Sequence, residues 1–455
     1  MSQRHPEALA RRPTVPLWTI YWLVIGATIV GTSLPRLSHG SWVWRTGSTA
    51  AGVYGGVALE WEWVDVAQSA WFAEGDPRWG GRLTSSLKGQ NALRFVPGLA
   101  VSWLGTWTRH AWPAAVLATV LCWLTAAWAM FRLGQRLLPD PARGRRVGAV
   151  GAALVALSPG FGAFIGNVDA HPFGYAAAAL SLLALEVAWA ARRRGESGDR
   201  LGAPWLIGVV IFLANGSLEL GPVLLAMVWL FYVAAPSVFG APDGAGGLAA
   251  SRAGAGWALV VTVTYLALQG GWWLVATVAS LGTVGGYNEG LPLLLRALRG
   301  VGSAPVVGSE VTGIGLLTAG GLVNIFTLPV VALAVPGLLV LPRRSALWAV
   351  LWVGLVVAAS LVTRNFGRVH YLAYPGVYLA AGAAVEWIGA LVAGWAAVGP
   401  VAARRPSAGS GWLRRGTATA LRWVVPGWLL YAVGRAVLGD LGGDLTMARH
   451  WWPGP

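Results

Sequence analysis

The feature that most constrains this chain is a series of apolar stretches, separated by short polar segments, along almost its whole length. About 20 consecutive apolar residues are needed for an α-helix to cross the hydrocarbon core of a bilayer. The pattern predicts an all-α polytopic membrane protein with about 11 transmembrane helices. The expected spans are 16–34, 112–131, 147–166, 173–191, 203–217, 220–235, 256–275, 318–341, 345–363, 371–395 and 417–438. The pair 203–217 and 220–235 is short and interrupted by Gly and Pro, so the sequence leaves the number of spans there open.

Composition excludes the other broad classes of protein. Apolar residues make up 56% of the chain and charged residues only 11%, whereas about a quarter of a soluble domain is charged. Cys122 is the only cysteine, which excludes a disulfide scaffold. The net charge of +15 could indicate a nucleic-acid-binding protein, but almost all the cations are arginines in short clusters between apolar stretches. We therefore expect the lipid bilayer, and no nucleic acid, as a partner.

The arginine clusters also predict how the chain crosses the membrane. Cytoplasmic loops carry an excess of Lys and Arg, and arginines occur here in alternate loops when the N-terminus is placed in the cytoplasm. Clear clusters lie at 143–146, 192–194, 343–344 and 404–415, and most acidic residues fall on the other side. We expect a multi-pass protein of the inner (cytoplasmic) membrane of a bacterial cell envelope. Its N-terminus would be cytoplasmic and its polar chemistry extracytoplasmic.

The whole chain, 1–455, is expected to form a single integral membrane domain. Within it, 16–235 forms an N-terminal module with a long extracytoplasmic first loop, 35–111, and 256–438 supplies the C-terminal helices. The first loop is rich in tryptophan, which prefers the headgroup level of a bilayer. We therefore expect this loop to contain membrane-lying helices, one of them amphipathic and extending over 59–73.

Two acidic residues of the first loop are candidates for acid–base chemistry. Glu62 and Asp65 lie on one face of the expected helix 59–73, whereas Glu60 lies on another. A carboxylate at a partly dehydrated surface holds its proton more strongly than one in water, which suits a general base. The alternative is a solvated carboxylate on the polar face of an interfacial helix. We rank Asp65 first and Glu62 second.

The short loop between the third and fourth expected spans carries Asn167, Asp169 and His171. A carboxylate and an imidazole at the outer mouth of two helices could face the same cavity as Asp65. The alternative is structural, because Pro172 suits the start of a helix that Asp169 could cap. A helix start needs one capping group, and this loop supplies three.

A third candidate group, Arg364, Arg368 and His370, follows the ninth expected span on the outer side. Guanidinium groups four residues apart can bind a phosphate through paired hydrogen bonds, and their outer location opposes the positive-inside trend. The alternative is that they anchor the protein to lipid headgroups. Arg296 and Arg299 form a second phosphate-binding candidate, with a solvated amphipathic helix as its alternative.

Acidic residues within the apolar stretches leave other functional classes open. Glu186, Glu219 and Glu386 lie in or beside expected spans, where a charge is costly unless it faces protein or water. A secondary transporter would use such residues as proton or ion sites, although the sequence shows no partner for Glu186 or Glu386. A further alternative is a non-catalytic membrane assembly protein. The chain has no P-loop, HExxH, GxSxG or Cys/His metal motif.

Taken together, these motifs resemble those of the GT-C superfamily of polytopic membrane glycosyltransferases. In such enzymes a long outer loop follows the first span, and in it an Asp precedes small and aromatic residues, a Gly and a Pro, as in WVDVAQSAWFAEGDP at 63–77. The loop 167–171 matches the position of a second acid, and the cluster 364–370 before Tyr374 and Pro375 matches a late Arg/His cluster. The similarity is best over the first four spans.

The resemblance implies an inverting transfer of a hexosyl or pentosyl group from a polyprenyl-phosphate-linked donor to a lipid, glycan or protein acceptor. Asp65 would be the base, Asp169 and His171 would orient the acceptor or assist the leaving phosphate, and Arg364 and Arg368 would bind that phosphate. Several such families have adjacent acids in the first loop, which Asp65 lacks, so no cofactor is certain and a divalent cation stays open.

The spatial arrangement of the polar groups distinguishes the alternatives. An enzyme of this kind should gather Asp65, Asp169 and Arg368 in one outer cavity. A transporter should gather its acids near the middle of the membrane. In an assembly protein the three residues should be scattered.

Overall fold

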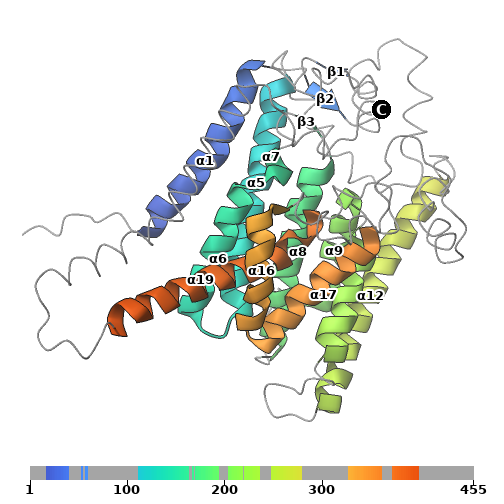
Figure 1. Ribbon diagram of the computed structural model, residues 1–455. Coiled ribbons are helices and arrows are strands. Elements are labelled where there is room, and N and C mark those ends of the chain that lie inside the picture. Colours follow the sequence, from blue (N-terminus) through green and yellow to red (C-terminus); the bar gives the residue numbers. More distant parts are fainter. Residues whose placement is uncertain are drawn as a thin grey trace, which may run out of the picture.

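The protein is a helical bundle with a small sheet at one end (Figure 1). The computed structural model describes residues 17–39, 53–54, 57–59, 111–162, 167–168, 170–193, 203–218, 220–235, 247–278, 326–360 and 371–398. The helices are α1 (Leu17–His39), α5 (Ala111–Leu137), α6 (Pro141–Ala156), α7 (Pro159–Gly162), α8 (Ala170–Arg193), α9 (Pro204–Leu218), α10 (Gly221–Met227), the π-helix η4 (Val228–Ala234), α12 (Gly247–Val278), α16 (Leu328–Val340), α17 (Arg343–Ser360), the 3₁₀ turn η5 (Tyr371–Ala373) and α19 (Tyr374–Val398).

The expected spans correspond to these helices. Each of them overlaps a helix except 417–438, which lies outside the described residues. The bounds differ most for 147–166, because α6 already begins at Pro141 and ends at Ala156. Asp140 accepts a hydrogen bond of 2.8 Å from the backbone N–H of Ala142, and such a cap followed by Pro starts a helix whatever the hydropathy of its first turn.

The helices pack closely through small residues, as in other membrane bundles. Gly144 and Gly148 are four residues apart in α6, and both face α5. A side chain at Gly148 would collide with the backbone of Phe131, so this close approach requires glycine. The α5–α6 pair therefore forms a rigid hairpin against which α8 and α19 pack.

The outward faces of the bundle are apolar. Leu339 is 84% exposed, Leu23 65% and Leu274 64%, which is typical of side chains that contact lipid rather than water. The stretches Leu117–Leu137 in α5 and His171–Arg192 in α8 are long and apolar enough to cross a bilayer by themselves. The interior holds large buried aromatic residues, among them Trp123, Trp352 and Tyr374.

The bundle has two chemically different ends. The strand end holds β1 (Val53–Tyr54), β2 (Val57–Leu59) and β3 (Asn167–Val168) together with the first turn of α8, and these strands lie at the top of Figure 1. The basic end holds the α5–α6 turn and the α16–α17 turn, with their arginines. Among the described helices, α5, α6 and α8 run alternately between the two ends (Figure 1), in agreement with the alternating arginine clusters.

The sheet is very small and connects distant parts of the chain. β1 and β2 are antiparallel, and β2 pairs with β3 in parallel, with Ala58 opposite Asn167 and Leu59 opposite Val168. Leu59 was expected to begin the amphipathic helix 59–73, but it is the last residue of β2. The remainder of that expected helix lies outside the described residues.

Candidate functional site at the strand end

The pairing of β2 with β3 brings the long first loop against the 167–171 loop. β2 ends three residues before Glu62 and six before Asp65, whereas β3 ends directly before Asp169. Backbone hydrogen bonds between the strands fix this register. Two of the three predicted site segments therefore start from neighbouring strands.

Aromatic contacts bring the first turns of α8 to the third segment. His171 and Tyr175 of α8 have ring centroids 6.1 Å apart, and the Tyr175 ring lies 4.8 Å from that of Tyr371. Tyr371 belongs to η5 and directly follows the predicted cluster Arg364, Arg368 and His370. Tyr175 and Tyr371 are both fully buried, so this contact belongs to the packed core.

Hydrogen bonds hold η5 in place from two sides. The Tyr374 hydroxyl donates to the carbonyl oxygen of Tyr175 at 2.9 Å, and the indole N–H of Trp352 donates to the carbonyl oxygen of Leu372 at 2.8 Å. Both bonds are buried, where a hydrogen bond is costly to lose. The residues that directly follow the predicted arginine cluster, η5 and the first residue of α19, are thus bonded to both α8 and α17.

Of the predicted site residues, His171 is described, and it lies in the first turn of α8 with 2% of its surface exposed. The others lie outside the described residues: Glu62, Asp65, Asp169, Arg296, Arg299, Arg364, Arg368 and His370. Helix α8 begins at Ala170 with Pro172 in its first turn. Asp169 directly precedes this helix in the sequence, and both of its interpretations stay predictions. Among the described residues, no cluster of His, Cys, Asp and Glu could hold a metal ion.

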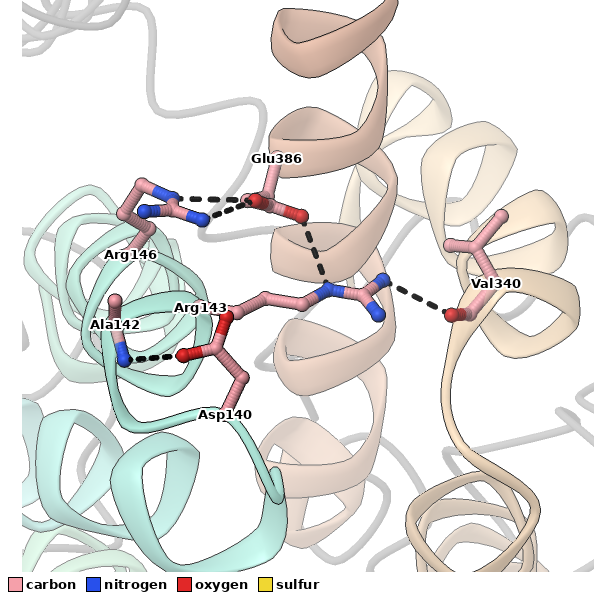
Figure 2. Close-up of polar contacts among 6 residues, drawn as sticks. All are labelled: Asp140, Ala142, Arg143, Arg146, Val340 and Glu386. Atoms are coloured by element: carbon pink, nitrogen blue, oxygen red, sulfur yellow. Dashed lines mark hydrogen bonds and ion pairs between the residues drawn. The ribbon is translucent and has the colours of Figure 1, made fainter.

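At the basic end, two arginines bind one of the intramembrane acids (Figure 2). Arg143 Nε lies 3.1 Å from Glu386 Oε2, and Arg146 NH2 lies 2.8 Å from Glu386 Oε1. Arg143 also donates to the carbonyl oxygen of Val340 at 3.0 Å, so that Figure 2 shows α6, α19 and the end of α16 joined by one guanidinium group. We call Glu386 and its two arginine partners, Arg143 and Arg146, the Glu386 clasp.

A second acid is paired deeper in the bundle. Glu186 is 3% exposed, and its carboxylate accepts hydrogen bonds from the Arg344 guanidinium group at 2.9 and 3.1 Å. The Tyr232 hydroxyl donates to the same carboxylate at 2.7 Å, and Arg344 also stacks over the ring of Phe231 at 5.1 Å. Because Tyr232 lies in the π-helix η4, this network joins α8, η4 and α17.

These ion pairs bear on the transporter alternative. Sequence reasoning found no partner for Glu186 and Glu386, but each has an arginine partner at the basic end. They also lie on different helices and in separate networks, rather than together near the middle of the bundle. Glu219 lies outside the described residues. The two described acids, Glu186 and Glu386, therefore form ion pairs that hold helices together, and this explains their presence in the spans without an ion-transport role.

The Glu386 clasp leads to a stability prediction. Glu386→Gln should lower the free energy of unfolding by about 1–2 kcal/mol, because the 10% exposed carboxylate pairs with two arginines. The loss is not larger because the Arg146 side chain is 56% exposed, so that solvent screens its charge. Arg145→Ala, on the exposed side of the same turn, is the control and should change it by less than about 0.5 kcal/mol. Thermal unfolding in detergent measures both variants. Equal unfolding midpoints for Glu386→Gln and the unaltered protein would show that the Glu386 clasp does not stabilise the bundle.

The described helices form a polytopic bundle, and the comparisons with solved structures agree with this fold. No protein-family model matches the chain, and no curated protein matches it. Two solved structures of ArnT from Cupriavidus metallidurans are similar. The apo state has 15% identity and a TM-score of 0.55 over 96% of this chain and 77% of that one. The form bound to undecaprenyl phosphate has 15% identity and a TM-score of 0.52 over 95% and 74%.

The oligosaccharyltransferase of Archaeoglobus fulgidus, in a complex with Zn and sulfate, is also similar, with 13% identity and a TM-score of 0.50 over 95% of this chain. The chain corresponds to 53% of that protein, or about half its length. Both proteins are membrane glycosyltransferases of the GT-C superfamily. At these identities the likeness establishes the fold alone, and this fold is the all-α polytopic membrane fold, like that of GT-C proteins, expected from the sequence.

Proposed function

We propose that the protein is a membrane glycosyltransferase that moves a sugar from a polyprenyl-phosphate-linked donor to an acceptor at the outer membrane face. The observation that carries this proposal is the convergence of three distant chain segments at the strand end. β2 pairs with β3, and Tyr175, one turn after His171, packs on Tyr371. The segments bearing Asp65, Asp169 and Arg368 adjoin these described contacts in the sequence, which supports a site formed from all three segments.

The reaction assigns a role to each predicted group. Asp65, assisted by Glu62, accepts the proton of an acceptor hydroxyl, whose oxygen forms a bond to the anomeric carbon of the sugar. The bond from that carbon to the phosphate oxygen breaks with inversion, and the polyprenyl phosphate leaves with the electron pair. Asp169 and His171 orient the acceptor. The leaving group is already a good one, so the protein contributes mainly positioning and charge stabilisation.

Arg364 and Arg368, with His370, are proposed to bind the donor phosphate, and Arg296 and Arg299 are the second candidates. Fixed positive charge at this place stabilises the leaving phosphate more in the transition state than in the ground state. One similar solved structure, that of ArnT, is bound to undecaprenyl phosphate, which makes a polyprenyl phosphate a reasonable ligand to test here.

The remaining assignments belong to the same proposal. The sugar is a hexose or pentose, and the acceptor is a lipid, a glycan or a protein. The protein lies in the inner membrane with a cytoplasmic N-terminus, so that the strand end faces outward. The similar oligosaccharyltransferase is a complex with Zn and sulfate, and a divalent cation held by residues of the first loop is compatible with the proposed chemistry.

Binding of undecaprenyl phosphate tests the proposal. Arg364→Ala combined with Arg368→Ala should weaken binding at least about 100-fold, because each charge-assisted hydrogen bond contributes about 1.5–3 kcal/mol. Native mass spectrometry of the protein in detergent measures the affinity. The control is Arg145→Ala combined with Arg343→Ala, which removes two exposed arginines from the basic end and should leave the affinity unchanged.

The possible outcomes separate the interpretations of the arginine pair. An unchanged affinity in the Arg364 and Arg368 double variant would return these residues to the role of headgroup anchors. An equal loss of affinity in both double variants would show that binding of undecaprenyl phosphate depends only on the net charge of the protein. Absence of binding by the unaltered protein would contradict the proposed donor class.

A further inference from the structure

The tyrosine cluster, which consists of Tyr175, Tyr371 and Tyr374, is a rigid connection between two parts of the proposed site. The rings of Tyr371 and Tyr374 stack at 5.2 Å with an interplanar angle of 18°. Tyr175 meets Tyr371 edge-on at 4.8 Å, and all three side chains are fully buried. Paired aromatic rings of this kind stabilise the packing beyond the effect of their buried area.

One polar contact in this cluster links the two helices directly. The Tyr374 hydroxyl donates to the backbone carbonyl of Tyr175, which lies one turn after His171. Tyr374 is the first residue of α19, directly after η5. The bond therefore joins the second turn of α8 to the start of α19, two described elements that lie close in the sequence to the segments 167–171 and 364–370.

The packing around Tyr371 leaves it little freedom. The ring of Phe161 lies 6.0 Å from it, and that of Phe326 stacks on it at 5.8 Å. A side chain at Gly160 would stand 2.6 Å from the Tyr371 ring, so this close approach requires glycine. Close-packed interiors transmit small displacements instead of absorbing them. A shift of η5 would thus be passed on to the chain that directly precedes it.

We propose that Tyr374 is a positioning residue, which holds α8 at a fixed spacing from η5 and the start of α19 through its hydrogen bond to Tyr175. These residues directly follow the proposed donor-phosphate segment 364–370 in the sequence. The inference rests on the proposed function and adds to it a residue outside the predicted motifs. Tyr374 touches neither donor nor acceptor; it acts through the arginines, whose geometry decides whether both can bind one phosphate group.

Tyr374→Phe tests this inference, because it removes the hydroxyl and keeps the ring. The affinity for undecaprenyl phosphate should fall roughly threefold to tenfold, the loss that one buried hydrogen bond predicts. The control is Tyr21→Phe in α1, whose hydroxyl donates to the backbone carbonyl oxygen of Ala149 in α6. It removes a comparable tyrosine hydroxyl from a contact that involves neither α8 nor η5, and its affinity should stay within about twofold of the unaltered protein.

Non-additivity distinguishes positioning from a general loss of stability. In the background of Arg364→Ala and Arg368→Ala, Tyr374→Phe should weaken the residual binding no further, because the groups through which it acts are gone. If the unaltered protein binds undecaprenyl phosphate and Tyr374→Phe binds it equally well, the positioning role is wrong while the proposed function stands. Equal losses in Tyr374→Phe and Tyr21→Phe, or fully additive losses, would also contradict it. If the unaltered protein does not bind, the proposed function itself fails.

Discussion

Replacing Asp65 by asparagine is expected to slow sugar transfer about 100-fold to 10,000-fold, the contribution typical of a general base. The amide keeps the size of the carboxylate but cannot accept the proton of an acceptor hydroxyl. Binding of undecaprenyl phosphate should not change, because the phosphate is assigned to Arg364 and Arg368. The measurement is the release of undecaprenyl phosphate from a panel of undecaprenyl-phosphate-linked hexoses and pentoses in membranes that contain the protein.

Glu60→Gln is the matched control for this experiment. It makes the same change from acid to amide five residues earlier in the chain, on a different face of the expected helix, and it should retain near-normal turnover. Glu62→Gln tests the second candidate, and a large loss there with normal turnover in Asp65→Asn would exchange the two roles. Normal turnover in Asp65→Asn removes this carboxylate from the mechanism, provided that intact binding shows the variant to be folded.

The helical bundle could be predicted from the sequence because the bilayer imposes a length on each apolar stretch. The alternating arginine clusters also predicted which helix ends meet, since Arg344 and Glu186 lie at the same end. The start of α6 was missed because hydropathy does not register the cap at Asp140. Strands β2 and β3 were missed because they are only three and two residues long. Strands this short show no recognisable pattern in the sequence, and they form only where distant segments of the chain meet.

The candidate site could be predicted as a set of segments but not as a geometry. The loop 167–171 and the cluster 364–370 stand out because they place charge and polarity beside apolar stretches. The residues next to these two segments are brought together by a contact between Tyr175 and Tyr371. Nothing in the sequence distinguishes these two tyrosines from the other aromatic residues of the spans. Contact between residues so far apart in the chain depends on which helices are neighbours, which periodicity does not encode.

The partners of the intramembrane acids were missed for the same reason. Glu386 and Arg143 are 243 residues apart in the chain, and only the packing of α6 against α19 makes them adjacent. A weak signal was nevertheless present. A positive-inside topology places the arginines of 143–146 and 343–344 at the same end of the bundle as the C-terminal half of α8, which holds Glu186. Glu386 lies at the middle of α19, where the long arginine side chains of α6 reach it.

Replacing Arg344 by methionine is expected to destabilise the protein by about 3–5 kcal/mol, because it leaves the charge of Glu186 buried without its cation. Glu186 is 3% exposed, and the Tyr232 hydroxyl would be its one remaining partner among the hydrogen bonds given above. Because the Arg344 side chain is 33% exposed, water can reach the site in part, and we expect a loss near the lower end of this range. Thermal unfolding in detergent, followed by size-exclusion chromatography, measures it.

Arg343→Met is the matched control, since Arg343 is the exposed neighbour in the same turn, and it should change the unfolding free energy by less than about 0.5 kcal/mol. A double variant, Arg344→Met with Glu186→Met, separates charge from packing. It removes both ions and leaves the Tyr232 hydroxyl without its acceptor, a loss of about 1 kcal/mol. It should therefore be more stable than Arg344→Met alone, because a buried ion pair contributes little beyond an apolar pair of similar size. A double variant as unstable as Arg344→Met would show that the guanidinium group acts through its packing on Phe231, and not by neutralising Glu186.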